Sequence, residues 1–229
     1  MAELLRAEAL VRPPVVMAVV KLRKECFFSV ETLAEFYEEL KDCQRCSLGK
    51  TRTNIVFGAG NENADLVFVG EAPGCNEDIQ GKPFVGAAGK LLDKLLDSIG
   101  LVRDQIYIAN VLKCRPPKNR DPLPSEIETC KPFLLKQIEI IKPKVVCTLG
   151  RFATQVILDK NVPISKVRGK CFDGNGYYIF PIYHPAAALY QRTNLDKLKA
   201  DFLILKELLS SKVDKLAQKE ETTEQLMFF

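Results

Sequence analysis

The sequence predicts an α/β fold, a three-layer α/β/α arrangement around a central, mainly parallel four-stranded sheet. Short apolar runs of strand length alternate along the chain with amphipathic segments of helix length, an order typical of parallel sheets covered by helices. Hydrophobic residues make up 47% of the 229 residues, which is enough for one substantial core. Charged residues, at 27%, are mixed in sign, which argues against a disordered chain.

The four predicted strands are short and largely apolar, as expected for strands buried on both faces of a sheet. They cover residues 66–69, 106–109, 144–149 and 177–182. In such sheets the functional site lies beyond the carboxyl ends of the strands. The loops in which we expect the site therefore begin at Gly70, Asn110, Gly150 and Tyr183.

The predicted helices follow from apolar residues spaced three and four positions apart. Ser29 is expected to cap the first helix, which leads the chain into Cys43. Gly100 stands where a helix ending at Ile99 needs a left-handed residue. Pro132 must kink or restart a later helix, because proline lacks the amide hydrogen that a helix interior uses. The later helices are expected over 88–99, 125–141 and 195–216.

We expect one domain over residues 29–211, with an N-terminal extension over 1–28 and a C-terminal tail over 212–229. Charged side chains near the start interrupt any apolar segment of a signal peptide. The apolar run over 13–20 is shorter than the ~20 residues that a membrane span needs. We therefore expect a cytoplasmic protein without a membrane partner. We also expect a monomer. The net charge of +4 permits binding to a polyanion without requiring it.

Four of the eight cysteines have a spacing that indicates a metal site. Cys43 and Cys46 form a C-x2-C pair, and Cys130 and Cys147 supply two further sulfurs from a predicted helix and the next strand. Either of the last two, taken alone, is more often a core residue, since free cysteine is commonly buried. Sulfur ligation suits zinc and an iron–sulfur cluster equally, so the spacing leaves both open. The others are expected to be structural: Cys26, Cys75, Cys114 and Cys171.

The loop after the first predicted strand is rich in glycine and acidic side chains. The segment from Gly70 to Asp78 can present backbone N–H groups to a ligand, but its acidity disfavours phosphate. It is better suited to a neutral polar ligand or to positioning water, with a plain turn as the structural alternative. Phe84, between glycines and a proline, is suited to stack on a planar ligand.

His184 is the only histidine in the chain, and it follows the fourth predicted strand. A lone histidine is more often a packed or surface residue than a catalytic one. Its place at the carboxyl end of a strand, directly before Pro185, favours a catalytic role. Its ring can donate a hydrogen bond to an oxygen that gains negative charge as a bond breaks.

Taken in order, these segments resemble family 4 of the uracil-DNA glycosylases, the branch with an iron–sulfur cluster that is common in archaea and thermophilic bacteria. The resemblance covers roughly residues 32–210. It is carried by GEAPG at 70–74, GKPFVG at 81–86, Asn110 and HPAAAL at 184–189. It implies the fold of that superfamily, a partner in uracil-containing DNA, and a [4Fe-4S] cluster on Cys43, Cys46, Cys130 and Cys147.

The resemblance also implies a pocket for uracil, which must be flipped out of a duplex before it can be reached. Phe84 would stack on the flipped base, and the amide of Asn110 would read its Watson–Crick edge, which cytosine does not match. The residues that would close the pocket are Gly70, Glu71 and Ala72.

The implied reaction is hydrolysis of the N-glycosidic bond, which leaves an abasic site for base excision repair. His184 would hydrogen-bond the carbonyl oxygen that becomes anionic as uracil leaves. Glu77 would stabilise the cationic sugar and Asn119 would position water, while the residue that activates the water stays open. Leu189 would fill the gap left in the duplex, and Arg192 would contact a phosphate.

The chain ends in residues 225–229, QLMFF, whose paired phenylalanines resemble a peptide that binds sliding clamps. Three other functions compete with the glycosylase. A related branch that traps DNA covalently needs a histidine in a basic insert, which this chain lacks. A non-catalytic iron–sulfur or zinc module that binds nucleic acid would tolerate changes of His184 and Asn110. A redox carrier would give the pocket residues no role.

Overall fold

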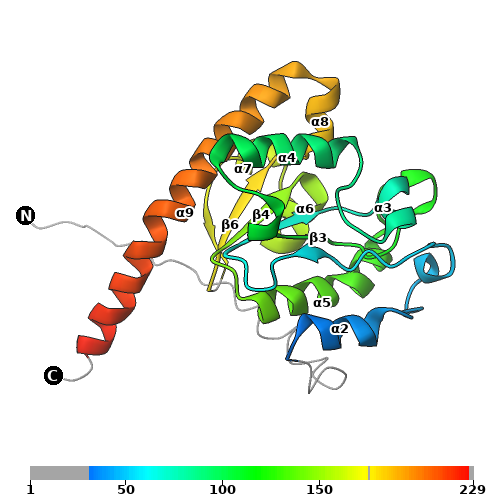
Figure 1. Ribbon diagram of the computed structural model, residues 1–229, viewed down its shortest axis with the longest axis horizontal. Helices are drawn as coiled ribbons and strands as arrows, with labels where there is room; N and C mark the ends of the chain where they lie inside the picture. Colours follow the sequence, from blue (N-terminus) through cyan, green and yellow to red (C-terminus); the bar gives the residue numbers. More distant parts are fainter. Residues whose placement is uncertain (1–30, 175, 227–229) are drawn as a thin grey trace, which may run out of the picture.

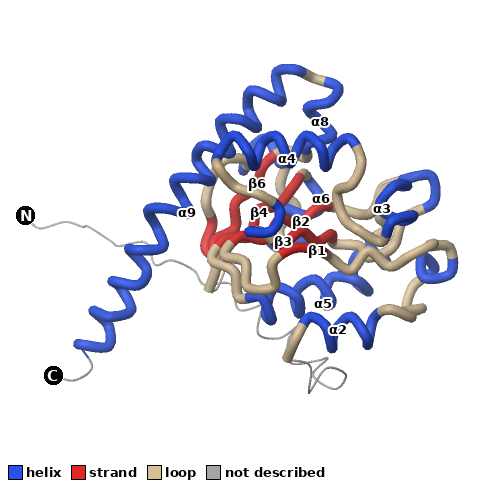
Figure 2. Tube along the Cα trace, in the orientation of Figure 1, coloured by secondary structure: helices blue, strands red, loops and turns tan. Residues whose placement is uncertain are grey.

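A six-stranded sheet forms the centre of the protein (Figure 1). The computed structural model describes residues 31–174 and 176–226, with side chains through residue 210. The strand order is β1-β3-β2-β4-β6-β5. The four inner strands are parallel, and each short outer strand runs antiparallel to its neighbour. Helices cover both faces, which confirms the predicted three-layer α/β/α fold (Figures 1 and 2).

The elements have the following bounds. The strands are β1 (Ala59–Gly60), β2 (Leu66–Gly70), β3 (Tyr107–Asn110), β4 (Val145–Leu149), β5 (Phe172–Asp173) and β6 (Tyr178–Ile182). The first α-helices in the described chain are α2 (Leu33–Leu40), α3 (Cys75–Gln80), α4 (Ala87–Ile99) and α5 (Pro124–Ile141). They are followed by α6 (Arg151–Leu158), α7 (Ile164–Val167), α8 (Pro185–Tyr190) and α9 (Arg192–Leu226). Short 3-10 helices are η1 (Ser47–Lys50), η2 (Arg103–Gln105) and η3 (Pro117–Asn119).

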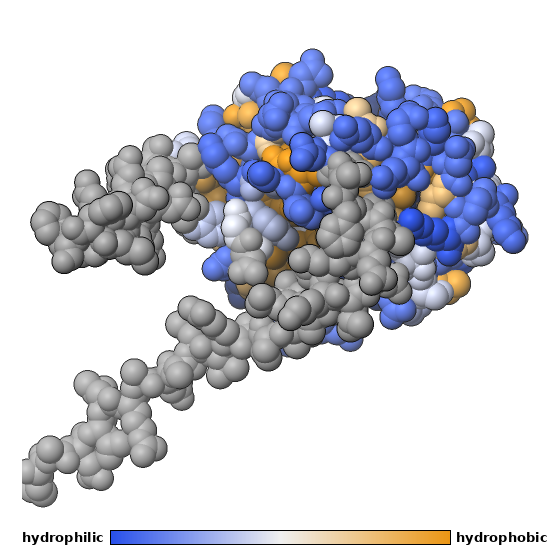
Figure 3. Space-filling view, turned by 90° about the horizontal axis from the view of Figure 1, so that it is seen from below, coloured by the Kyte–Doolittle hydropathy of each residue, from blue (hydrophilic) through white to orange (hydrophobic). Residues whose placement is uncertain are grey.

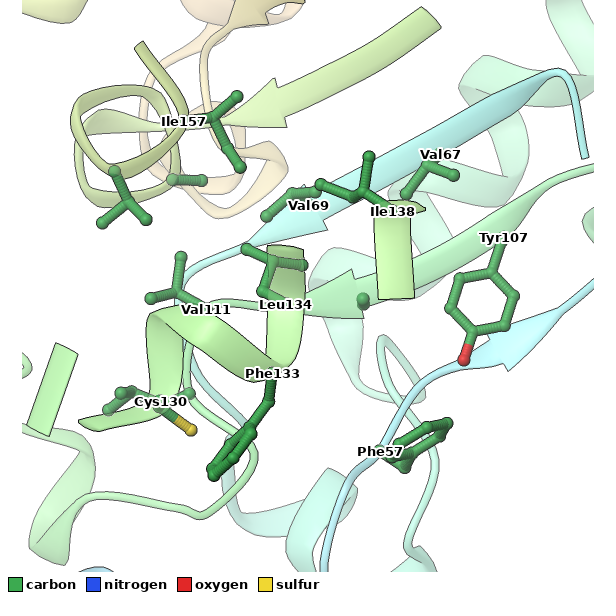
Figure 4. Packing of buried hydrophobic residues seen from close by; sticks show 14 of the residues in the cluster. Phe57, Val67, Val69, Tyr107, Val111, Cys130, Phe133, Leu134, Ile138 and Ile157 are labelled. Carbon is green, nitrogen blue, oxygen red and sulfur yellow. The ribbon is translucent and has the colours of Figure 1, made fainter. Parts of the chain in front are cut away.

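Successive residues of each inner strand face opposite layers, as the pleat of a strand requires. Val67 and Val69 of β2 belong to the core shared with α2, α5 and α6. Leu66 and Phe68 belong to the second core, shared with α4 and α9. Figure 4 shows part of the first core, with Ile138 of α5 beside the β2 valines. Both faces of the sheet are therefore buried, which explains why the predicted strands read as continuous apolar runs.

The four predicted strands correspond to β2, β3, β4 and β6, and the sequence did not indicate β1 or β5. Each of these outer strands has only two residues, too few to produce an apolar run or an alternating pattern. The predicted left-handed residue at Gly100 is confirmed, with φ of 82° at the end of α4. Helix α5 continues through Pro132 to Ile141, so no new helix begins at the proline.

The first helix is capped by Thr32, and the prediction of Ser29 as its cap is wrong. Thr32 Oγ1 accepts a hydrogen bond from the Glu35 N–H at 3.2 Å, and the Glu35 carboxylate accepts from the Thr32 N–H at 3.1 Å. This reciprocal pair satisfies two backbone donors at once, which a lone serine further upstream does not. Ser29 itself and the predicted extension over 1–28 lie outside the described residues.

The last helix, α9, is longer than the sequence indicated. Its backbone continues to Leu226, past the domain boundary expected at residue 211. No helix in the described part of the chain has both the length and the apolar content that a membrane crossing requires. Seen from below in Figure 3, the described surface is mostly hydrophilic, with smaller hydrophobic areas between the polar side chains.

Candidate active site and cysteine cavity

The predicted pocket residues come together at the edge of the sheet where the parallel strands end. β2 and β3 pair so that Gly70 lies opposite Asn110. His184 follows β6, and the centre of its ring lies 5.5 Å from that of Phe84, with 29° between the ring planes. The strand ends thus unite residues that are more than a hundred positions apart in the sequence.

Gly70 allows the close approach of the other pocket residues because it has no side chain. A Cβ atom at this position would lie 2.3 Å from Asn110 Oδ1 and 2.7 Å from Phe84 Cε2, well inside contact distance. The amide of Asn110 and the ring of Phe84 therefore both meet the backbone of Gly70. A hydrogen-bonding edge beside an aromatic face is the arrangement that recognises a flat heterocycle.

Asn110 is the member of this group with a buried hydrogen-bond acceptor that is free to bind a ligand. Its side chain is 2% exposed, and its Oδ1 has no hydrogen-bond partner among the described residues. An unpaired buried acceptor costs about 1–3 kcal/mol, and most buried polar groups avoid that cost by pairing. A ligand that brings an N–H group to Asn110 Oδ1 would remove the cost.

Phe84 is held in a left-handed backbone conformation, with φ of 54°, which is rare for a residue other than glycine. Its carbonyl oxygen accepts a hydrogen bond from Arg103 Nη2 at 2.5 Å. The amides of the next two residues, Val85 and Gly86, donate to Glu77 Oε1 at 3.0 and 2.9 Å. Glu77, predicted to act on the sugar, thus also positions the Phe84 loop. No pattern in the sequence indicated this role of Arg103, which binds the Phe84 carbonyl oxygen and pairs with the Asp93 carboxylate.

His184 is arranged as a neutral hydrogen-bond donor. Its Nδ1 accepts the backbone N–H of Ala186 at 3.1 Å, so Nδ1 carries no proton and the ring proton lies on Nε2. Burial lowers the pKa of His184 to about 4, and the nearby Glu77 carboxylate opposes that shift more weakly. The ring therefore remains neutral at physiological pH and offers its Nε2–H group to a ligand.

Glu71 and Ala72 directly follow Gly70 at the end of β2. Burial raises the pKa of the half-buried Glu71 to about 7; Asp121 reinforces this shift and Arg151 opposes it. Ala72 is partly buried and packs against the core that contains α5. A carboxyl group that is partly neutral at physiological pH repels a polyanion less than an ordinary glutamate does.

The remaining predicted residues lie on more exposed elements. Asn119 is exposed on η3, where its Oδ1 accepts from Arg115 Nε at 2.8 Å; within the described chain no hydrogen bond joins it to the pocket. Leu189 is 48% exposed on α8, the short helix that begins directly after His184. Arg192 is exposed at the start of α9. Leu189 thus follows His184 by five positions in the sequence, and its side chain is accessible.

The structure contradicts the predicted cysteine set in one member. Cys43, Cys46 and Cys130 line one small cavity together with Cys114, which was expected to be structural only. Cys147 is fully buried in the other core, on the face of the sheet covered by α4 and α9. Alternation along β4 turns its side chain away from α5, which carries Cys130.

The cavity offers donors that suit charged sulfur ligands. Arg52 Nη1 lies 3.2 Å from Cys114 Sγ, and the backbone N–H of Lys113 lies 3.4 Å from Cys130 Sγ. Burial raises the pKa of the Cys130 thiol to about 12, so metal ligation is what would keep this sulfur as a thiolate. In the described residues, no three His, Cys, Asp or Glu side chains are arranged around a single-ion position. Four thiols around one cavity fit a larger, sulfur-ligated centre.

Comparison with known proteins decides the family. A family model described as the uracil DNA glycosylase superfamily matches residues 57–208. The type-4 uracil-DNA glycosylase of Archaeoglobus fulgidus is 49% identical over 191 residues, which cover 80% of this chain and 96% of that protein. This chain belongs to the type-4 uracil-DNA glycosylases. The type-4 enzyme of Saccharolobus solfataricus is 51% identical over 184 residues, or 76% of this glycosylase and 85% of its relative. That of Thermotoga maritima is 48% identical over 170 residues, or 73% and 88%.

The depressed pKa of His184 predicts a pH-dependent stability. Between pH 6.5 and about pH 4 the unfolded chain binds a proton that the folded glycosylase excludes, so the free energy of unfolding falls as pH falls through this window. This group alone should lower it by ~3 kcal/mol between neutral pH and pH 4. Denaturant unfolding at several pH values measures the effect, and His184→Asn, whose side chain can still accept the Ala186 N–H, is the control. The same pH dependence in both proteins would contradict the prediction.

Proposed function

We propose that this glycosylase releases uracil from DNA by hydrolysing its N-glycosidic bond, and leaves an abasic site for base excision repair. The observation that carries the proposal is the buried, unpaired Oδ1 of Asn110 beside the ring of Phe84. Uracil presents a ring N–H next to a carbonyl oxygen, which matches an amide acceptor and donor. Cytosine presents a bare ring nitrogen next to an amino group, which would set acceptor against acceptor and donor against donor.

Bond cleavage transfers an electron pair from the bond between the sugar C1′ and uracil N1 onto the departing base. Negative charge grows on the uracil carbonyl oxygen, and the Nε2–H group of His184 donates a hydrogen bond to it. Because Ala186 fixes the tautomer, this donor is in place before the bond breaks. Water then adds to the sugar C1′ and loses its proton, which completes hydrolysis.

The cationic sugar needs negative charge nearby, and two residues are proposed to serve it. Glu77 uses Oε1 to hold the Phe84 loop, and its charge acts on His184, which places it close to the pocket. Asn119, oriented by Arg115, is the proposed partner for the attacking water. The exposed Leu189 is proposed to enter the duplex when the base flips out, and Arg192 to contact a phosphate.

We also propose that Cys43, Cys46, Cys114 and Cys130 hold a [4Fe-4S] cluster. When bound, the cluster would link the segment after α2, the loop after β3 and helix α5. The support is the set of four thiols around one cavity, with Arg52 and a backbone amide directed at two of the sulfurs. A cytoplasmic location and a monomeric state remain predictions from the sequence.

Release of uracil tests the proposed function directly. The wild type should form abasic sites in single- and double-stranded DNA that contains one uracil. His184→Ala and Asn110→Asp should each slow uracil release by about 100-fold or more, because each loses a bond to the leaving base. Asn110→Asp should also act on cytosine, since a protonated carboxyl group can donate to its ring nitrogen. Asn63→Asp, the same change at an exposed position before β2, is the control. Absence of abasic sites with the wild type would refute the proposal.

The corrected cysteine set predicts different outcomes for two buried thiols. Cys114→Ala should lose iron and acid-labile sulfide, because it removes one ligand of the cluster. Cys147→Ala should retain both, since Cys147 lies on the other face of the sheet. Iron and sulfide per chain, together with the visible absorption spectrum, measure the difference. The reverse pattern, with iron lost from Cys147→Ala and kept in Cys114→Ala, would restore the original prediction.

For the C-terminal tail we propose binding to a sliding clamp. The tail over residues 225–229 lies outside the residues whose side chains are described, so the proposal rests on its sequence alone. Immobilised clamp should retain the intact protein and release a variant with Phe228→Ala and Phe229→Ala, while both cleave uracil from free DNA at the same rate. Failure of the clamp to retain the intact protein would refute this part.

A further inference from the structure

Lys113 connects the cysteine cavity to the residue proposed to read uracil. Its side chain is 1% exposed, and its Nζ donates to the backbone carbonyl oxygen of Asn110 at 2.8 Å and to Gln137 Oε1 at 2.5 Å. Its own backbone N–H points to Cys130 Sγ, and the next residue, Cys114, lines the same cavity. A single buried residue therefore contacts both centres.

The carbonyl of Asn110 needs this partner because the neighbouring strand ends too early. β1 pairs with β3 only at Tyr107 and Ile108, so the outer edge of β3 at Asn110 has no strand partner in the described chain. The Lys113 ammonium supplies the hydrogen bond that a strand N–H would otherwise make. Gln137, which accepts from Lys113 Nζ, is itself held in place because its Nε2 donates to the Phe57 carbonyl oxygen at 2.9 Å.

Lys113 lines the cysteine cavity, and its charge interacts with two of the sulfurs there. Within the described residues its two hydrogen-bond acceptors, Asn110 O and Gln137 Oε1, are uncharged. A buried cation is costly unless negative charge lies close to it. The groups whose negative charge would act on Lys113 are the sulfurs of Cys130 and Cys114, which become thiolates when they bind metal. A filled cavity thus supplies the counter-charge for a lysine that holds the backbone of Asn110.

We propose that Lys113 is a positioning residue through which the cysteine-bound cluster sets the Asn110 amide for base recognition. The inference rests on the proposed function, because it explains how the base-reading residue is held. It gives the cluster a part in uracil recognition although the cluster touches no reacting atom.

The variant Lys113→Met tests this link in the iron-loaded protein, because it keeps the length of the side chain and removes its charge and donors. Free uracil should bind about tenfold more weakly, since the Asn110 backbone loses its anchor. The turnover number on uracil-containing DNA should fall while KM for the DNA stays the same, because the DNA contacts are unchanged. The reduction potential of the cluster should become more negative, since loss of a nearby positive charge disfavours the added electron.

Two further variants separate this role from a general loss of stability. Lys136→Met removes a lysine from α5 that pairs with Glu139 on the surface, and it should change neither uracil binding nor the potential. Gln137→Met removes one hydrogen-bond partner of Lys113, so it should weaken uracil binding about threefold. It keeps the charge of Lys113 and every cysteine, so the reduction potential of the cluster should be unchanged. Combined with Lys113→Met it should weaken binding no further, because both act on one group.

The outcomes are decisive in each case. Unchanged uracil binding and unchanged potential in iron-loaded Lys113→Met would overturn the inference, as would an equal loss of binding in Lys136→Met. If Lys113→Met does not fold, Gln137→Met decides alone, and unaltered uracil binding in that variant overturns the inference. If the wild type neither binds nor releases uracil, the proposed function fails, and the inference fails with it. If the wild type releases uracil and the Lys113→Met variant behaves in the same way, the inference alone is overturned.

Discussion

The pairing of four parallel strands is the constraint on which the site depends. Parallel register places Gly70 opposite Asn110, and the next pairings bring the end of β6 to the same edge. Both faces of the sheet are buried. A slip of one residue in the register of a strand would turn its side chains to the opposite faces, and neither core would then pack correctly. Hydrophobic burial over the whole sheet thus fixes the relative positions of a few polar groups at its edge.

Much of the fold was predictable because its signals are local. Apolar runs identified the four inner strands, and the rule that sites follow strand ends singled out the loops at Asn110 and Tyr183, which carry the predicted site residues Asn110 and His184. The family resemblance supplied what local patterns lacked, namely which of these residues share one pocket. The contacts of Arg103 were not predictable, because an arginine that binds a backbone carbonyl 19 positions away leaves no pattern in the sequence. The outer strands β1 and β5 were missed because two residues are too few to form an apolar run or an alternating pattern.

The error at Cys147 shows where sequence reasoning ends. Fifteen residues (115–129) separate Cys114 from Cys130, and sixteen (131–146) separate Cys130 from Cys147, so spacing favoured neither as the fourth ligand. The deciding fact is the face of the sheet to which each side chain points. A strand buried on both faces has apolar residues at every position, and its sequence therefore does not reveal which face meets α5.

The Phe84 loop has a consequence for evolution. Its strained backbone persists because Arg103 holds the carbonyl, Glu77 holds the following amides, and Gly89 leaves room where a Cβ atom would come within 1.8 Å of that same carbonyl oxygen. A mutation at any one of these positions releases strain that the others were sustaining, so its effect depends on what the others are. A substitution at one of these positions is therefore not neutral while the other two are unchanged. We expect Arg103, Glu77 and Gly89 to be inherited together, or to change together with the aromatic residue that they hold.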